Sequence, residues 1–198
     1  MRQAGDPVQL LVRTIAERAP DPAHPLLIAL DGRSGAGKST LARTVAAQTG
    51  AATIEGDDFY GGGTVARWRA MTAPEKVAHV IDWRRQREVL EALAQGQPAT
   101  WYLYDWQAND GRLATEPVTL EPASIVILDG AYSARPELAD LFAVRVLLNT
   151  LRDIRRAQLA RREGDHYRAE WESLWSEAED HYFGLIMPEE AFDLVLGS

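Results

Sequence analysis

The sequence contains no cysteine among its 198 residues. Disulfides, thiolate metal sites and a cysteine nucleophile are therefore excluded, and a cytoplasmic location is expected. Long apolar runs are also missing. The longest, at residues 26–30 and 125–128, have the length of strands, whereas a membrane-spanning helix needs about 20 apolar residues. The sequence therefore predicts a chain with no membrane partner.

Positive charge is in the minority. Lys and Arg number 21 against 29 Asp and Glu, which gives a net charge of −8. This balance disfavours general binding to nucleic acid or to anionic lipid. We therefore expect no nucleic-acid partner, and leave open whether the chain forms a homo-oligomer.

The apolar residues, 46% of the chain, are enough to build a sizeable core. Buried strands are predicted at residues 26–31, 52–55, 100–104, 124–129, 143–148 and 191–196. Helices are predicted at residues 7–19, 38–48, 77–94, 136–141, 151–163 and 168–183. Because strands alternate with helices, the sequence predicts an α/β three-layer sandwich with a parallel sheet and helices on both faces. Ligands of such folds bind at the carboxyl ends of the strands.

A glycine-rich segment follows the first buried strand and precedes a helix. Gly32-Arg-Ser-Gly-Ala-Gly-Lys-Ser39 matches the phosphate-binding P-loop pattern in full. In such a loop the backbone N–H groups point at phosphate oxygens, the lysine reaches the β- and γ-phosphates, and the hydroxyl ligates Mg²⁺. The candidate nucleotide-binding residues are therefore Gly32, Ser34, Gly35, Ala36, Gly37, Lys38, Ser39 and Thr40. The alternative is a glycine-rich turn that only joins a strand to a helix.

Acidic residues follow two other predicted strands. Asp129 ends the strand at residues 124–129, where P-loop proteins hold Mg²⁺ together with the loop hydroxyl. A plain Asp-Gly turn is the alternative. Asp57 and Asp58 follow the strand at residues 52–55. One of this pair is expected to orient an acceptor hydroxyl and take its proton, unless the pair is a solvated turn or a helix cap.

Arginines concentrate between Arg152 and Arg168 in this otherwise acidic chain. Dense guanidinium charge suits phosphate groups and stacks on bases. A helix with a solvated basic face would have the same composition, and this alternative stays open.

Taken in order, these motifs resemble a kinase family. The P-loop, Asp57-x-Phe-Tyr60, Tyr104-Asp-Trp106, Asp129-Gly130 and the arginine-rich segment resemble the uridine–cytidine kinase, phosphoribulokinase and pantothenate kinase family. The resemblance runs from Leu26 to Leu196. It implies a single P-loop kinase domain over residues 1–198, with a small helical lid at about 155–170, that uses ATP and Mg²⁺.

The resemblance also implies roles for individual residues. Asp57 would be the catalytic base, assisted by Lys38 and by Arg162 in the lid. Arg155 and Arg162 match lid arginines that bind the nucleotide, and Arg168 would reach the phosphates. The implied acceptor-binding residues are Asp57, Tyr60, Asp82, Tyr104, Asn109 and Arg168.

Two positions depart from the family pattern. Asn109 stands where uridine kinases have a base-reading histidine, and Leu159 stands where they have a lid arginine. The resemblance therefore predicts a nucleoside acceptor first, and leaves a sugar, an aminocyclitol or a vitamin precursor as alternatives. A P-loop ATPase or switch with a protein partner, or a relative that only binds nucleotide, is a different class. The intact Lys38, Ser39, Asp57 and Asp129 argue against a relative that only binds.

Overall fold

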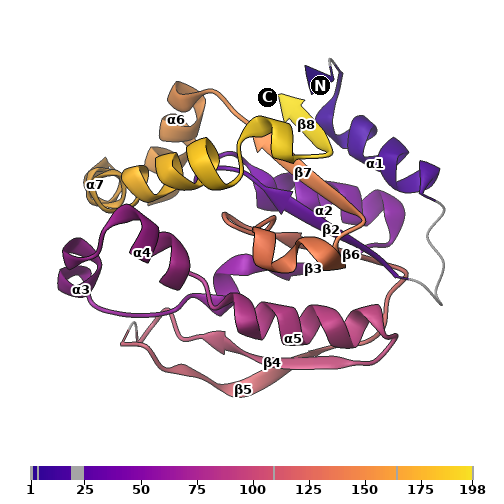
Figure 1. The fold of residues 1–198 in the computed structure, drawn as a ribbon, viewed down its shortest axis with the longest axis horizontal. Coiled ribbons are helices and arrows are strands. Elements are labelled where there is room, and N and C mark those ends of the chain that lie inside the picture. The colour runs from indigo at the N-terminus through magenta and orange to yellow at the C-terminus, as the bar shows by residue number, and fades with distance from the viewer. Residues whose placement is uncertain (1, 4, 19–24, 109, 164, 198) are drawn as a thin grey trace.

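The computed structural model describes residues 2–3, 5–18, 25–108, 110–163 and 165–197. Its centre is a parallel sheet in the strand order β1–β8–β7–β2–β6–β3 (Figure 1). These strands are β1 (Arg2–Gln3), β2 (Leu26–Asp31), β3 (Ala52–Glu55), β6 (Ile125–Asp129), β7 (Val144–Asn149) and β8 (Leu194–Gly197). The predicted α/β fold with a parallel sheet is confirmed.

Helices cover both faces of this sheet. The helices are α1 (Pro7–Glu17), α2 (Lys38–Thr49), α3 (Val65–Ala70), α4 (Ala73–His79), α5 (Trp83–Ala94), α6 (Arg152–Glu163) and α7 (Asp165–His181). Short 3-10 turns span Gly56–Phe59, Pro136–Leu141 and Glu189–Ala191, and a π-helical turn spans Tyr182–Ile186. The predicted helix at residues 136–141 is thus a 3-10 turn.

Two cores flank the sheet because successive side chains of a strand point to opposite faces. In β2, Leu26, Ile28 and Leu30 join the core under α1 and α2, whereas Leu27 and Ala29 join the core under α5 and α7. All six residues of β2 and all five of β6 are buried. Burial on both faces explains why these strands are continuous apolar runs in the sequence.

The helix predicted at residues 77–94 is wrong as a single element. It is two helices, α4 and α5, separated at residues 80–82. Ile81 forms an antiparallel bridge with Tyr60, and the Asp82 side chain accepts a hydrogen bond from the N–H of Arg85 to begin α5. Val80 and Ile81 are buried in the core, so these two apolar residues gave no sign in the sequence that the helix was interrupted.

The strand predicted at residues 100–104 lies outside the main sheet. As β4 (Ala99–Tyr104), it pairs antiparallel with β5 (Leu113–Leu120) in a separate hairpin. No strand was predicted at β5, because its residues are mostly exposed and include a proline, Pro117. Figure 1 shows this hairpin beside α5, at the edge of the molecule.

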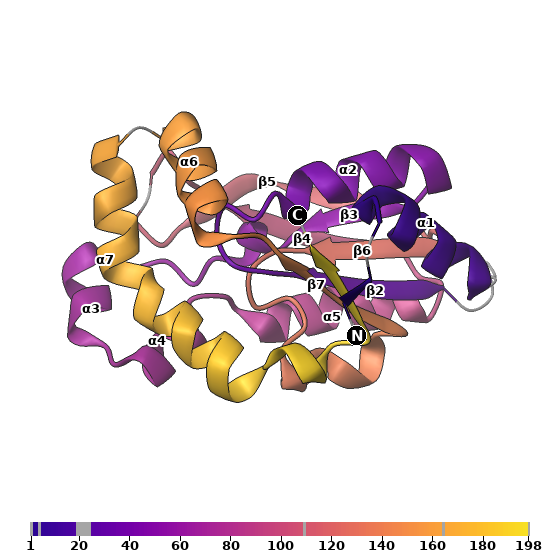
Figure 2. The ribbon, with the colours of Figure 1, turned by 90° about the horizontal axis from the view of Figure 1, so that it is seen from above.

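The segment predicted as a lid, at about 155–170, falls on α6 and α7, which pack side by side at one end of the molecule (Figure 2) and are called the lid region below. Helix α7 begins at Asp165, earlier than the predicted start at residue 168. Helix α4 contacts this region through Lys76, whose Nζ donates a hydrogen bond to the buried carbonyl oxygen of Leu174 in α7 at 2.8 Å. In the part of the chain that the structure describes, no helix is long and apolar enough to cross a membrane.

Candidate active site

The P-loop connects the end of β2 to the start of α2. Gly35 (φ 74°) and Gly37 (φ 95°) have left-handed backbone conformations that favour glycine. A Cβ at Gly35 would lie 2.6 Å from the carbonyl oxygen of Arg155, so this position also lacks room for a side chain. Lys38 Nζ donates to the carbonyl oxygens of Gly32 at 2.8 Å and Arg33 at 3.2 Å. The lysine side chain therefore lies along the glycine-rich loop.

A cavity of about 440 Å³ opens above this loop. Its walls come from three strand ends, the lid and the β4–β5 hairpin. Among its lining residues are Ser34 to Thr40, Glu55, Asp57, Tyr60, Trp106, Asp129, Leu159, Arg162, Trp175 and Glu179. The carboxyl ends of β2, β3 and β6 thus meet in one cavity, as expected for a parallel sheet.

Ser39 and Asp129 meet on the floor of this cavity. The Ser39 hydroxyl donates to Asp129 Oδ1 at 3.0 Å. Burial raises the pKa of Asp129 to about 6, although Lys38 and the Ser39 hydrogen bond lower it. Mg²⁺ prefers oxygen ligands and usually takes only one or two protein groups besides water and phosphate oxygens. A hydroxyl and a carboxylate side by side fit that preference, so this pair could hold Mg²⁺.

The structure separates the two neighbouring aspartates. Asp57 is exposed on the cavity wall. Asp58 accepts a hydrogen bond from Trp101 Nε1 at 3.3 Å and is absent from the cavity lining. Burial raises the pKa of Asp58 to about 6, against the lowering effect of the Trp101 hydrogen bond. Asp57 is therefore the member of the pair that can contact a molecule in the cavity.

Gly56 explains how Asp57 comes close to Asp129. A Cβ at Gly56 would lie 2.9 Å from the Asp129 carbonyl oxygen and 3.3 Å from Gly130 Cα. Only glycine therefore lets the turn after β3 pack directly on the end of β6. This contact brings the two carboxylates to the same cavity.

Asp31, which had no predicted role, supports the P-loop from behind. This fully buried carboxylate accepts hydrogen bonds from the N–H groups of Gly32 (2.7 Å), Tyr132 (2.9 Å) and Ala134 (3.0 Å) and from the Tyr182 hydroxyl (2.8 Å). Burial raises its pKa to about 6, while these bonds oppose the rise. Asp31 thus connects the start of the P-loop with the segment after β6 and with the π-helical turn that follows α7.

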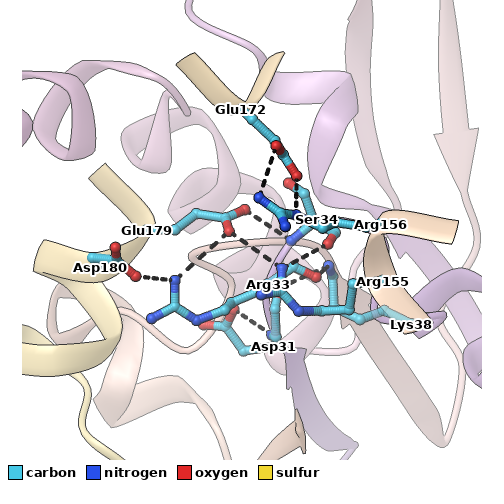
Figure 3. A network of polar contacts seen from close by, with 10 residues as sticks. Asp31, Arg33, Ser34, Lys38, Arg155, Arg156, Glu172, Glu179 and Asp180 are labelled. Atoms are coloured by element: carbon cyan, nitrogen blue, oxygen red, sulfur yellow. Dashed lines mark hydrogen bonds and ion pairs between the residues drawn. The ribbon is translucent and has the colours of Figure 1, made fainter. Parts of the chain in front are cut away.

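Glu179 of α7 was also not predicted. Its Oε1 accepts a hydrogen bond from the N–H of Ser34 at 2.8 Å, and only 6% of the residue is exposed (Figure 3). Nothing in the sequence around Glu179 marks it, because its partner lies 145 residues away. Glu55 and Trp175 also line the cavity without having been predicted to do so.

Several predicted site residues lie elsewhere. Gly32 is behind the cavity, where a Cβ would lie 2.6 Å from the Leu148 carbonyl oxygen. Arg155 lines a neighbouring cavity, and its Nη1 donates to the Ser34 carbonyl oxygen at 3.2 Å. Asp82 caps α5 and is absent from the cavity lining, so the structure does not bring it to the predicted acceptor site.

Tyr104 lies one layer back from the cavity. It is buried, and its ring packs edge-on against Tyr60 at 4.9 Å and Trp106 at 4.8 Å, both of which line the cavity. The predictions for Asn109 and for the side chain of Arg168 fall outside the described part of the chain. The structure therefore brings together the P-loop from Ser34 onward, Asp57, Tyr60, Asp129 and Arg162.

Comparison with known proteins shows which folds are similar to this one. A family model described as cytidylate kinase matches residues 28–124. Comparison with curated protein sequences gives no significant match. The fold is similar to that of a possible uridine kinase from Bacillus stearothermophilus (TM-score 0.71, 20% identity, 96% of this chain and 97% of that chain).

Two further solved structures are similar over most of their lengths. D-glycerate 3-kinase from Cryptococcus neoformans has a TM-score of 0.62 at 13% identity, covering 98% of this chain and 96% of that chain. Phosphoribulokinase from Rhodobacter spheroides has a TM-score of 0.60 at 15% identity, covering 89% and 71%. The resemblance to uridine kinase-like P-loop kinases is confirmed at the level of the fold.

Proposed function

We propose that this protein transfers the γ-phosphate of ATP to a hydroxyl group of a small molecule, with a nucleoside as the first candidate acceptor. The observation that carries the proposal is that Asp57 lines the same cavity as Lys38, Ser39 and Asp129. A carboxylate facing the phosphate-binding residues is what transfer to a hydroxyl requires.

Each of these groups has a defined task in the proposed reaction. The P-loop N–H groups and the positive end of α2 hold the phosphates, and Lys38 stabilises charge on the transferring group. Ser39 and Asp129 would hold Mg²⁺, which supplies neutralisation of phosphate charge when bound. Asp57 orients the acceptor hydroxyl and accepts its proton as the new P–O bond forms. The bond from the γ-phosphorus to the β–γ bridging oxygen breaks, and ADP leaves.

The lid supplies the remaining wall. Leu159 and Arg162 of α6 line the cavity on the side opposite the sheet. Leu159 is buried against the P-loop, where a Cβ at Gly35 would lie 2.8 Å from its Cγ. An apolar side chain at this position excludes water from the phosphates, which limits ATP hydrolysis.

The acceptor end of the cavity combines aromatic rings with carboxylates. Tyr60 and Trp106 stack with their ring centroids 5.0 Å apart, and 49% of Trp106 is exposed. An exposed indole face suits a nucleoside base or the apolar face of a sugar ring. Glu55 stands on the same wall as Asp57. Two carboxylates favour an uncharged or cationic acceptor, which supports a sugar or an aminocyclitol as the second candidate.

The test is acceptor-dependent release of ADP from Mg·ATP, screened with nucleosides, sugars, aminocyclitols and vitamin precursors. We expect one acceptor class to accelerate ADP release, and Asp57→Asn to lower the rate by roughly 10²–10⁴-fold. Asp58→Asn is the matched control and should keep near-normal activity. If no acceptor accelerates ADP release and Asp57→Asn leaves slow hydrolysis unchanged, the kinase proposal is wrong and an ATPase or switch is favoured.

A further inference from the structure

The peptide groups of Ser34 are bound from two sides. Its N–H donates to Glu179 Oε1 of α7 at 2.8 Å, and its carbonyl oxygen accepts from Arg155 Nη1 of α6 at 3.2 Å. Figure 3 shows both side chains converging on the loop from the two helices of the lid region. One residue of the P-loop is therefore held by both lid helices.

Glu179 also sits between two arginines. Its Oε2 lies 3.9 Å from Nη1 of Arg33 and 3.9 Å from Nη1 of Arg155. Arg33 is in turn paired with Asp180 at 2.6 Å. A buried carboxylate is costly without hydrogen bonds and opposite charge, and both are present here. The contacts account for the position of Glu179, which the proposed reaction does not use as a base or as a Mg²⁺ ligand.

The same contacts connect the loop to the lid. Arg156 of α6 forms two hydrogen bonds with Glu172 of α7, at 2.7 and 3.2 Å, so the two helices are joined directly. The backbone of α6 also lies against Gly35, with no space for a Cβ between them. A displacement of α7 at Glu179 would therefore be transmitted to the loop both directly and through α6.

We propose that Glu179 is a positioning residue that sets the place of the first half of the P-loop, acting on the Ser34 peptide directly and through Arg155. The inference rests on the proposed function. The backbone of the second half of the loop is held by α2, to which Lys38 to Thr40 belong. Lys38 Nζ, the group that reaches the β- and γ-phosphates in P-loops, lies at the carbonyl oxygens of Gly32 and Arg33 in the first half. Glu179 should consequently affect the terminal phosphate more than the phosphates bound at the start of α2.

The experiment compares Glu179→Ala and Glu179→Gln with Glu177→Gln, an exposed glutamate of the same helix. Affinities for Mg·ATP and Mg·ADP are measured by calorimetry, and kcat and KM are measured with the best acceptor. We expect Glu179→Ala to lower kcat by about 10- to 100-fold, since a misplacement of about 1 Å costs up to about 10²-fold. It should weaken ATP binding at least about fivefold more than ADP binding, a change in the range of ordinary coupling between sites.

Glu179→Gln distinguishes positioning from general packing. Its amide oxygen can still accept the Ser34 N–H, so we expect it to recover most of the lost kcat. Glu177→Gln should behave as the wild type. If Glu179→Ala also loses its folded circular dichroism spectrum, Arg155→Ala replaces it, and the same preferential loss of ATP affinity is expected.

Two results would overturn the inference. One is unchanged kinetics and an unchanged ATP-to-ADP affinity ratio in a folded Glu179→Ala protein. The other is an equal loss of both nucleotides with a lowered Tm, which indicates packing alone. The affinity ratio needs no acceptor, so failure to find an acceptor contradicts the proposed function and still leaves the role of Glu179 tested.

Discussion

The two ends of the cavity are built in different ways. The phosphate end is one continuous segment, Ser34 to Thr40, whose contribution comes largely from backbone N–H groups and glycine conformations. The proposed acceptor end is assembled from Glu55 and Tyr60, which flank one 3-10 turn, and from Trp106 and Trp175, so three separate segments of the chain contribute to it. A short sequence motif is therefore enough to predict the proposed phosphate end, whereas the proposed acceptor end depends on side chains that only folding brings together.

The two ends also differ in charge. We assign Lys38 and Arg162 to the phosphate end, where the Asp129 and Glu179 carboxylates also lie, and Glu55 and Asp57 to the acceptor end, which has no cation assigned to it. A cation stabilises the transferring phosphoryl group, and a carboxylate takes the proton of the attacking hydroxyl. If this comparison is correct, substitutions at one end should alter the kinetic parameters of ATP, and substitutions at the other end those of the acceptor.

After Asp57→Asn, the largest effect is expected at the phosphate end. Lys38→Ala removes the cation that reaches the transferring phosphate, and we expect kcat to fall by roughly 10²–10³-fold. Steady-state ADP release checks this result, with Arg13→Ala on the exposed face of α1 as the control. Retention of most activity in Lys38→Ala would contradict the assignment of the phosphate end.

The next effect should appear in the Mg²⁺ requirement. Asp129→Asn keeps a hydrogen-bond acceptor for Ser39 but removes the charge, so we expect the Mg²⁺ concentration for half-maximal activity to rise by about 10- to 100-fold. A Mg²⁺ titration at saturating ATP measures the change. A lowered kcat with an unaltered Mg²⁺ titration would mean that Asp129 acts on the loop rather than on the metal.

A smaller and more selective effect is expected at the acceptor end. Trp106→Ala removes an exposed aromatic face, and we expect KM for the acceptor to rise about tenfold while KM for ATP stays within about twofold. Tyr102→Ala is the matched control, because Tyr102 is similarly exposed on β4 but is absent from the cavity lining. Equal changes in both KM values would contradict the assignment of Trp106 to the acceptor end.

The smallest effect concerns stability. The pKa of Asp58 is raised from 3.8 to about 6 by burial, so the folded state binds the proton more tightly than the unfolded state. Wild-type stability should therefore fall, relative to Asp58→Asn, as the pH rises from about 4 to about 6, and the difference should then level off. Because Asp58 is partly exposed, this decrease in the free energy of unfolding should stay below about 1 kcal/mol. Urea unfolding at several pH values measures it, and the opposite slope would contradict the burial argument.

Sequence patterns predicted the parts of the fold that depend on local chemistry. The runs at residues 26–30 and 125–128 are apolar throughout because both faces of these strands are buried, so they were recognisable without a structure. The division of residues 77–94 was not recognisable, because the bridge from Ile81 to Tyr60 is a tertiary contact. Strand β5 was missed because its exposed polar residues resemble a loop.

The same division applies to the site. The sequence by itself determined the phosphate-binding loop, the paired Ser39 and Asp129, and the presence of an aspartate after β3, because these depend on residue type and strand order. The family resemblance had already favoured Asp57 over Asp58, and the structure places Asp57 on the cavity wall. Only the tertiary structure decided that Arg155 binds the loop rather than lining the main cavity, and that Glu179 contacts Ser34. The physical reason is that a backbone cradle is local, whereas the direction of a side chain is set by packing partners far away in the chain.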